Sequence, residues 1–445
     1  MKERLRNAEV GALTGPSQWT ATLLKLLIYE SYFAKSAAAR FLPAATAVAI
    51  HYVSSILLIS GILLIQVILR PKRTKMSDRS LLGVGGLIIG WLFISALNQG
   101  EAGENCLAVA LVAAIAYLGT VALPTLLGWS YGPTLYGALL SSSRAITALS
   151  FLALIVPVVS AFDGGRFEGV TLDPAVAAGA FFIATCLFFV NWIRSRRVAG
   201  AFIWFVAAAI LTVLTRSRGA IGTTAVTCVL ILLLDKTTRG RSRRVVGALV
   251  VIVTAVSALV FWSRASEGQR GTTLEFLRLD SGDLLDSREP HWQAGLERIE
   301  SAKVFGLGIL LKFTSKGSVQ DQMRTGNTGY DVSMDPHNSL LNIGQAAGYP
   351  AAALLAVFLG LLFIKSSRLA LLTGTGFSAG TIFCVWLVLA DCATSFASPM
   401  FLSFGSLDDR IFYLCLGVVL ASSSKARMLS AIRKTTYAAA VPAPL

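Results

Sequence analysis

The sequence predicts an all-α polytopic integral membrane protein, on three observations. Hydrophobic residues make up 55% of the 445 positions and charged residues only 14%, whereas a soluble domain usually carries about 25% charged residues. Apolar runs of roughly 17 to 25 residues recur along the chain, which is the length needed to cross a bilayer. Basic residues gather in alternate loops between these runs, as they do on the cytoplasmic side of membrane proteins.

Eleven apolar runs are long enough to be read as spans. They cover residues 42–69, 80–98, 105–126, 144–161, 174–193, 198–215, 218–234, 245–262, 339–364, 372–390 and 407–422. The loops after the first, fifth, seventh and ninth runs are basic, and the loops between them are acidic or mixed. This alternation predicts the orientation of the spans as well as their existence, because basic loops stay in the cytoplasm.

A twelfth helix is expected near the N-terminus. Eleven spans would place the basic start, "MKERLR", outside the cell, against the positive-inside rule. A helix over residues 19–37 restores the balance, although it contains Lys25, Glu30 and Lys35. The alternative is an amphipathic helix lying in the membrane interface. We expect about 12 transmembrane helices.

The chain divides into four parts on this basis. Residues 1–262 form N-terminal membrane helices, and residues 337–424 form C-terminal membrane helices. Residues 263–336 form one large periplasmic loop with short helices, because "HWQAGLERIESAKVFG" has helical periodicity. Residues 425–445 form a cytoplasmic tail.

Several kinds of function find no support in the sequence. Nucleotide-binding and zinc-protease motifs are absent, so we expect no cofactor and no metal. The six cysteines lie in or beside apolar segments without CxxC spacing and are expected to pack as small apolar side chains. The net charge of +15 is explained by basic cytoplasmic loops. We therefore expect membrane lipids, and no nucleic acid, as partners.

The stretch "DPHNSLL" contains the first candidate for chemistry, His337. Asp335 and Pro336 are typical of a helix N-terminus, so His337 is expected in the first turn of a helix over residues 336–364, kinked at Pro350. The partial positive charge of a helix N-terminus disfavours imidazolium and attracts phosphate oxygens. A neutral imidazole there can act as a general base. The alternative is an ordinary polar residue at the membrane interface.

Three arginines are candidates for binding an anion. Arg216 and Arg218 lie between two apolar runs at an external boundary, where positive charge is disfavoured for topology. In a continuous helix they would point to different sides, so one is expected to line a cavity. Arg288 precedes the amphipathic helix of the loop, and a guanidinium suits bidentate phosphate recognition. The alternatives are snorkelling for the first two arginines and a solvated charge for Arg288. His51 and His291 have no comparable context.

Together these stretches resemble the O-antigen ligase and O-antigen polymerase superfamily. The resemblance rests on "SRGA" at Ser217–Ala220, the Arg288 region with its "G.G" pair, and "HNSLLNIGQAAGYPAAALL" from His337. It implies a metal-independent glycosyltransferase of the bacterial inner membrane, with the large loop in the periplasm. It also implies a glycan donor on undecaprenyl diphosphate, and a glycan or lipid A–core acceptor.

The resemblance also implies roles for the candidate residues. Arg218 and Arg288 would hold the donor pyrophosphate, with Arg216 as a further phosphate contact. His337 would activate the acceptor hydroxyl. An O-antigen ligase-like enzyme is the leading interpretation, with a Wzy-type O-antigen or exopolysaccharide polymerase as the alternative. A transporter of lipid-linked glycans is the alternative from another class; it would show internal repeats and discontinuous helices, and the sequence shows no repeat.

Overall fold

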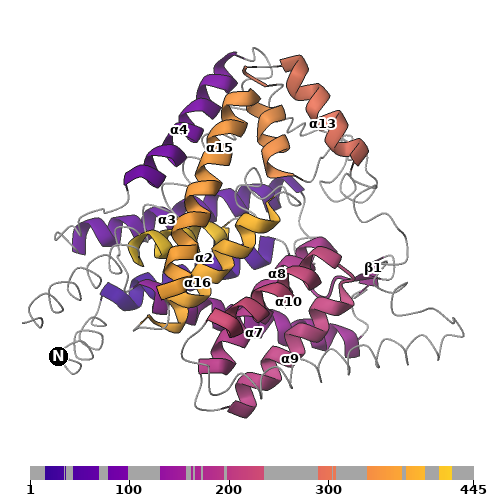
Figure 1. Ribbon diagram of the computed structural model, residues 1–445. Coiled ribbons are helices and arrows are strands. Elements are labelled where there is room, and N and C mark those ends of the chain that lie inside the picture. The colour runs from indigo at the N-terminus through magenta and orange to yellow at the C-terminus, as the bar shows by residue number, and fades with distance from the viewer. Residues whose placement is uncertain are drawn as a thin grey trace, which may run out of the picture.

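The computed structural model is almost entirely helical (Figure 1). It describes residues 16–34, 36, 44–69, 79–98, 131–156, 162–163, 166–171, 174–194, 198–234, 289–302, 304–306, 338–372, 377–395 and 410–422. The helices in chain order are α2 (Pro16–Ala34), α3 (Ala44–Leu69), α4 (Arg79–Asn98), α7 (Tyr131–Ile155), α8 (Pro174–Arg194), α9 (Val198–Leu214), α10 (Arg218–Leu234), α13 (Glu289–Ala302), α15 (Ser339–Leu372) and α16 (Ala379–Thr394). A C-terminal helix covers Arg410–Ser422.

Most of the predicted spans in this part of the chain are confirmed as helices. The helices α3, α4, α8, α9 and α10 agree with their predicted runs to within two residues. Four helices among the described residues are long and apolar enough to cross a membrane: Ser80–Asn98, Gly132–Ile155, Val176–Arg194 and Ser339–Leu371. This supports an integral membrane protein. The predicted runs at 105–126 and 245–262 lie outside the described residues, and the total of about 12 spans stays a prediction.

The predicted boundaries of three spans are wrong. Helix α7 begins at Tyr131, not at residue 144, because the polar "SSSR" stretch is helical rather than a loop. The hydroxyl groups of Ser141 and Ser142 donate to the carbonyl of Ala138 at 2.9 and 3.1 Å, so these polar groups are satisfied inside the helix. Helix α15 continues to Leu372 instead of ending at residue 364, so the "KSSR" stretch predicted as a basic loop is helical. Helix α16 consequently covers Ala379–Thr394 instead of 372–390.

The described part of the chain is consistent with the predicted all-α class but also contains one short hairpin that the sequence did not predict. Strands β1 (Phe162–Asp163) and β2 (Arg166–Phe167) pair antiparallel, with Phe162 opposite Phe167. The sequence between them is Gly164–Gly165, a dipeptide typical of tight hairpin turns. Phe167 is buried and stacks on Phe181 of α8, which anchors the hairpin on the helices.

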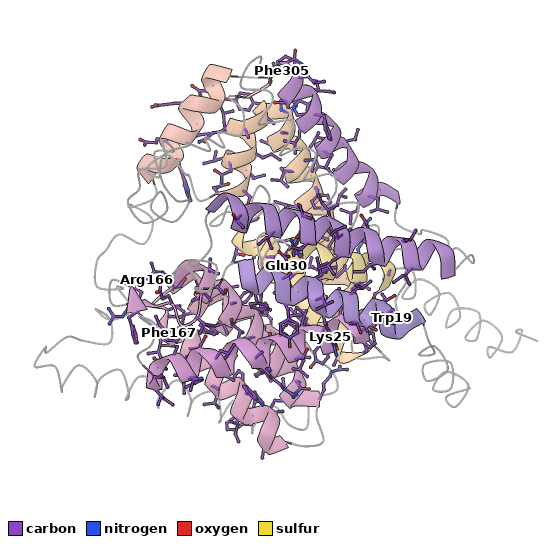
Figure 2. All side chains as sticks on the ribbon, turned by 180° about the vertical axis from the view of Figure 1, so that it is seen from behind. Trp19, Lys25, Glu30, Arg166, Phe167 and Phe305 are labelled. Atoms are coloured by element: carbon purple, nitrogen blue, oxygen red, sulfur yellow. The ribbon has the colours of Figure 1, made fainter. Side chains whose placement is uncertain are left out.

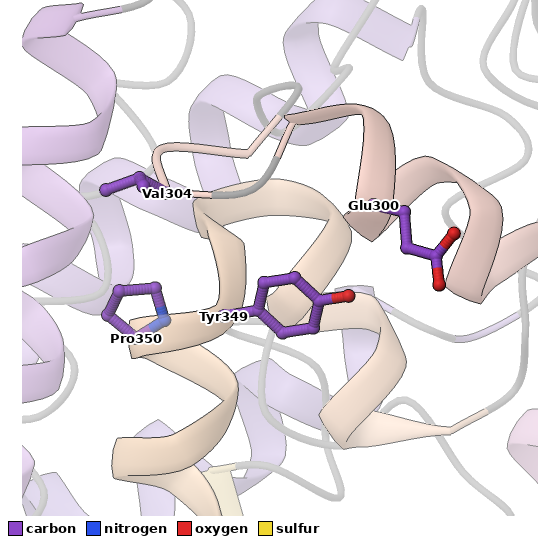
Figure 3. Close-up of a pocket in the computed structure, with 4 residues that line it drawn as sticks. All are labelled: Glu300, Val304, Tyr349 and Pro350. Carbon is purple, nitrogen blue, oxygen red and sulfur yellow. The ribbon is translucent and has the colours of Figure 1, made fainter.

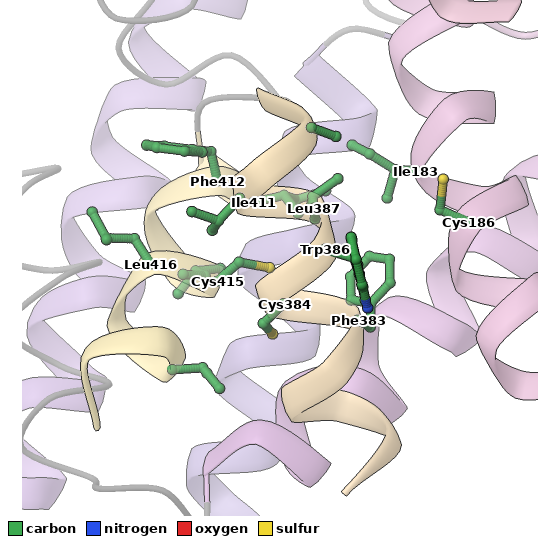
Figure 4. Packing of buried hydrophobic residues seen from close by; sticks show 14 of the residues in the cluster. Ile183, Cys186, Phe383, Cys384, Trp386, Leu387, Ile411, Phe412, Cys415 and Leu416 are labelled. Carbon is green, nitrogen blue, oxygen red and sulfur yellow. The ribbon is translucent and has the colours of Figure 1, made fainter. Parts of the chain in front are cut away.

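The centre of the bundle is built around α8, α16 and the C-terminal helix. Helix α8 packs against α7, α9, α10 and α16, and most of its length is buried. Figure 4 shows the packing between α8, α16 and the C-terminal helix, with Cys186, Cys384 and Cys415 among the buried side chains. All five described cysteines are buried, as expected of small apolar side chains.

Helix α2 confirms that the expected N-terminal helix exists. Its carboxylate, Glu30, lies inside the bundle (Figure 2) and forms an ion pair with Arg410 of the C-terminal helix. The two side chains are 12% and 5% exposed. Arg410 also donates to the hydroxyl groups of Ser31 and Ser55, both at 2.6 Å. The charge that makes α2 a poor lipid-facing helix is therefore paired inside the protein. Whether α2 crosses the membrane stays a prediction.

Candidate functional site

The two arginines of "TRSRG" lie in a tight turn between α9 and α10. Helix α9 ends at Leu214 and α10 begins at Arg218, which confirms the predicted break between the two spans, so the spacing of side chains around a continuous helix does not apply to Arg216 and Arg218. The backbone N–H of Arg216 donates to Val213 at 2.9 Å. Arg216 has φ = +53°, a left-handed conformation that non-glycine residues seldom adopt outside special sites. Arg216 is half-buried in this turn.

Ser217 caps α10 and places Arg218 at the first helical position. The Ser217 hydroxyl accepts the N–H of Ala220 at 3.4 Å, a weak N-cap bond. The first N–H groups of a helix have no partners within the helix, and they carry partial positive charge. Arg218 therefore belongs to an end of α10 that suits an anion. Its side chain lies outside the described part of the structure.

A further arginine, Arg166 of β2, reaches the same turn. Its Nε donates to the carbonyl of Thr215 at 3.2 Å. The hairpin thus holds a half-buried guanidinium beside the residue that precedes Arg216. Sequence reasoning missed Arg166, because the short hairpin brings it close to a turn 49 residues away. Figure 2 labels Arg166 on the hairpin.

The start of α15 differs from the prediction. The helix begins at Ser339, and the Oδ1 of Asn338 accepts the N–H groups of Leu340 at 2.9 Å and Leu341 at 3.3 Å. Asn338 is therefore the N-cap, and His337 precedes the cap instead of following it in the first turn. Asparagine is as good an N-cap as aspartate. The helix therefore starts after Asn338, and not after Asp335 as the Asp335–Pro336 pair predicted. The N–H of Ser339 donates to Ser395 at the end of α16, at 2.9 Å.

Helix α15 is broken into two limbs at Ala347 and Gly348. Ala347 has φ −136° and ψ 15°, and Gly348 has φ 80° and ψ 179°, a conformation that essentially only glycine adopts. The short limb is Ser339–Ala346 and the long limb is Tyr349–Leu372. Figure 1 shows the limbs side by side in orange; a Cβ on Gly344 would lie 3.4 Å from that of Ala352. The predicted kink is thus present, just before Pro350, whose missing N–H is not needed in a first helical turn.

The break is held by a set of contacts that we call the Trp91 lock: Trp91, Ser95, Phe305, Gly306 and Ala347. The indole N–H of Trp91 donates to the carbonyl of Ala347 at 2.8 Å. The rings of Trp91 and Phe305 stack with centroids 5.8 Å apart and an interplanar angle of 7°. The Ser95 hydroxyl donates to the carbonyl of Phe305. The lock therefore joins α4, the segment after α13 and the bend of α15.

Two glycines allow this close approach. Gly306 has φ = +76°, and a Cβ there would overlap the backbone of Ala346 and Ala347. A Cβ on Gly344 would lie 2.7 Å from Ile299 of α13. Helix α13 consequently packs directly on the short limb of α15.

A cavity of about 490 Å³ opens beside the lock, lined by Glu300, Val304, Tyr349 and Pro350. Glu300 lies on α13, and Tyr349 and Pro350 begin the long limb of α15. Figure 3 shows the Tyr349 ring projecting toward the part of α13 that carries Glu300.

The structure does not describe the side chains of the three principal candidates. Arg288 and His337 lie outside the described residues, each close to the start of a described helix: Arg288 directly precedes α13, and His337 precedes the cap of α15. Those two helices pack together, and α16 packs against both α15 and α10. Asp391 of α16, a buried carboxylate one turn before Ser395, was also missed. A lone acid inside an apolar run was the signal that could have found it.

An apolar helical bundle, with a short amphipathic helix docked on a broken helix, defines an integral membrane protein. Residues 203–356 match the sequence model of the O-antigen ligase family. The match covers about a third of the chain and includes α9, α10, α13 and the bend of α15. It confirms the resemblance recognised in the sequence: this region is similar to the O-antigen ligase family. The comparison with individual curated proteins found no match.

Proposed function

We propose that the protein is an inner-membrane glycosyltransferase of the O-antigen ligase type. It transfers a glycan from undecaprenyl diphosphate to an acceptor hydroxyl at the periplasmic face. The family match carries this proposal, because residues 203–356 include all four candidate residues: Arg216, Arg218, Arg288 and His337.

The reaction needs a base and a site for a departing anion. The acceptor oxygen attacks the anomeric carbon of the donor while the bond from that carbon to the diphosphate oxygen breaks. His337 takes the hydroxyl proton, and undecaprenyl diphosphate leaves with the bonding electron pair. The glycosyl diphosphate is already activated, so the transfer requires no ATP.

The geometry around α10 supports a site for the diphosphate. Developing negative charge is best stabilised by fixed donors already in place before the reaction. The N-terminus of α10, capped by Ser217, presents backbone N–H groups, and Arg216 lies in the turn just before it. Arg166 donates to the same turn and adds positive charge there. Arg218 and Arg288 complete the proposed anion site.

The polymerase alternative uses the same chemistry with a different acceptor. A ligase joins the finished chain to lipid A–core, whereas a polymerase joins it to another lipid-linked repeat unit. Deletion in the producing bacterium separates them. Bare core with accumulating lipid-linked polymer supports the ligase, and short glycan on lipid A–core without long chains supports the polymerase.

The broken helix α15 is an observation that also fits a transporter, since discontinuous helices form many transport sites. In transporters, however, such breaks lie near the bilayer midplane. The uncharged part of the long limb of α15, residues 349–364, has 16 residues before Lys365, about 24 Å at 1.5 Å per residue, and so reaches well past the middle of a hydrocarbon core about 30 Å thick. The position of the break therefore favours the enzyme.

The decisive experiment is transfer by purified protein supplied with lipid-linked glycan and acceptor, without nucleotide. His337→Ala, Arg218→Ala and Arg288→Ala should each lower turnover at least about a hundredfold, the usual contribution of an acid–base or anion-binding group. All three should insert normally, and His51→Ala should be silent. Wild-type protein that moves the lipid across vesicles without forming product would refute the enzyme and support transport.

A further inference from the structure

The cavity beside the Trp91 lock contributes no residue to the proposed anion-binding and acid–base groups of the transferase. It lies between Glu300 of α13 and the first residues of the long limb, Tyr349 and Pro350. Its volume of about 490 Å³ falls within the range of roughly 300–1,000 Å³ that is usual for small-ligand sites. Tyr349 is 47% exposed and Val304 is 48% exposed, so a ligand can reach the cavity walls.

We propose that this cavity binds one sugar ring of the acceptor glycan, stacked on Tyr349 and hydrogen-bonded to Glu300. The proposal rests on the proposed function, since it names where the acceptor of that reaction is recognised. It adds two residues that determine specificity to a site otherwise defined by anion-binding and acid–base groups.

The chemistry of the walls matches a sugar ring. A pyranose has one face of C–H bonds and a rim of hydroxyl groups. The negative face of an aromatic ring attracts weakly positive C–H groups, so the Tyr349 ring suits the apolar face. A carboxylate accepts strong hydrogen bonds from hydroxyl groups, so Glu300 suits the rim. Among the described residues, Val304 and Pro350 add apolar wall.

The same walls disfavour other ligands of this system. The donor diphosphate would be repelled by the carboxylate of Glu300, whereas Arg166 and Arg216 lie at the α9–α10 turn. A prenyl or acyl chain would have to remove that carboxylate from water without a compensating bond, which is costly. The cavity therefore suits a polar, uncharged group with one apolar face.

Two walls of the cavity adjoin the Trp91 lock, which matters because single sugar rings bind weakly. Val304 directly precedes Phe305, which stacks on Trp91. Tyr349 directly follows the break, where Trp91 holds the carbonyl of Ala347. Both walls are thus tied to one set of contacts, and a site formed in advance avoids part of the ordering cost of binding.

The experiment measures steady-state transfer and direct binding for matched pairs of variants. Tyr349→Ala removes the stacking platform, while Tyr349→Phe keeps it. Glu300→Gln removes the charge of the carboxylate. Phe363→Ala is the control for Tyr349, because Phe363 lies on the same limb, is 49% exposed and is not a wall of the cavity. Glu297→Gln is the control for Glu300, since Glu297 is an exposed carboxylate one turn earlier on α13.

Tyr349→Ala should raise the KM for the acceptor about tenfold, the scale of a lost ring stack, with kcat within about twofold of wild type. Tyr349→Phe and both controls should match wild type. Glu300→Gln should raise the acceptor KM about fivefold, because a charge-assisted hydrogen bond becomes a neutral one. Binding is followed by saturation-transfer NMR with two delipidated probes: core oligosaccharide and repeat-unit oligosaccharide from the producing bacterium. Tyr349→Ala should weaken binding of at least one probe by a similar factor.

Several outcomes would overturn the subsite. These are an unchanged acceptor KM and probe affinity in Tyr349→Ala, a fall in kcat alone, or a rise only in the donor KM. A change in co-purified lipid with unchanged probe binding would instead assign the cavity to lipid. If Tyr349→Ala fails to fold, the acceptor KM of Glu300→Gln, compared with that of Glu297→Gln, decides whether the cavity binds the acceptor. Wild-type protein that binds a probe through Tyr349 but transfers nothing would refute the proposed function and leave the sugar site intact.

Discussion

The buried ion pair between Glu30 and Arg410 holds helix α2 against the C-terminal helix. Two charges inside an apolar bundle are tolerated only when paired and hydrogen-bonded. Arg410 contacts Glu30, Ser31 and Ser55, which belong to α2 and α3. Sequence reasoning noticed Glu30 as a problem for α2 but did not find its partner. The two residues are 380 positions apart, and no local pattern connects them.

Removing one member of this pair should destabilise the protein. Arg410→Met leaves the Glu30 carboxylate buried without its partner, and Glu30→Leu does the same to the guanidinium. Each single change should cost about 3–5 kcal/mol of unfolding free energy, whereas the double variant should recover most of it. Thermal unfolding in detergent measures this, with a thiol-reactive dye reporting exposure of the buried cysteines. Equal losses in the single and double variants would contradict an energetic coupling of the two charges.

At the scale of elements, regular helices were predictable and their interruptions were not. The five spans that agree closely with the structure have long apolar runs bounded by charged, proline or other polar residues. The bend of α15 was expected at Pro350, but Gly348 turns the chain because only glycine adopts its backbone conformation easily. The Trp91 lock could not be foreseen, since it joins residues 91, 305 and 347, which share no sequence pattern.

The lock should control the position of α13 on the bend of α15. In Gly306→Ala, the new Cβ meets backbone atoms of Ala346 and Ala347 that cannot move aside easily, and φ = +76° is unfavourable for alanine. The Phe305–Gly306 segment should detach, lowering turnover about tenfold or more, as small misplacements of binding groups do. Limited proteolysis should cut the loop of residues 263–336 faster, measured on intact spheroplasts.

Matched variants separate the lock from general damage. Gly360→Ala, also on α15, adds a Cβ where nothing lies within 4 Å and should leave turnover and proteolysis unchanged. Trp91→Phe preserves an aromatic ring against Phe305 but removes the donor to Ala347, so its effect should be intermediate. Wild-type cleavage rates in Gly306→Ala would show that the lock does not hold the loop.

At the scale of the whole molecule, the sequence indicates the candidate residue types, and their assembly into one site stays a prediction. Three motifs, "SRG", the Arg288 region and "HN", were found from sequence, and the family match covers all of them. Arg166 was missed because an unforeseen two-stranded hairpin carries it to the α9–α10 turn. The contact between Arg166 and this turn depends on two segments that lie 49 residues apart. No single sequence motif contains both segments.

The predicted orientation of the protein in the membrane can be tested by locating two of its loops. Single cysteines introduced at Ser318 in the large loop and at Lys72 after α3 should lie on opposite sides of the membrane. A membrane-impermeant maleimide should label Ser318→Cys in spheroplasts and Lys72→Cys only after permeabilisation. The native background should be low, because all five described cysteines are buried; replacing Cys106 with serine removes the sixth.

A third cysteine, at Ser17 near the start of α2, decides between eleven and twelve spans. If α2 crosses the membrane, Ser17→Cys should resemble Lys72→Cys, since the basic N-terminus then stays in the cytoplasm. The pairing of Glu30 with Arg410 inside the bundle favours this outcome, because an interfacial helix would turn its charged side chains to water. Labelling of Ser17→Cys from outside would instead leave eleven spans. Labelling of Lys72→Cys from outside would show that the predicted orientation is reversed. The large loop would then not lie in the periplasm.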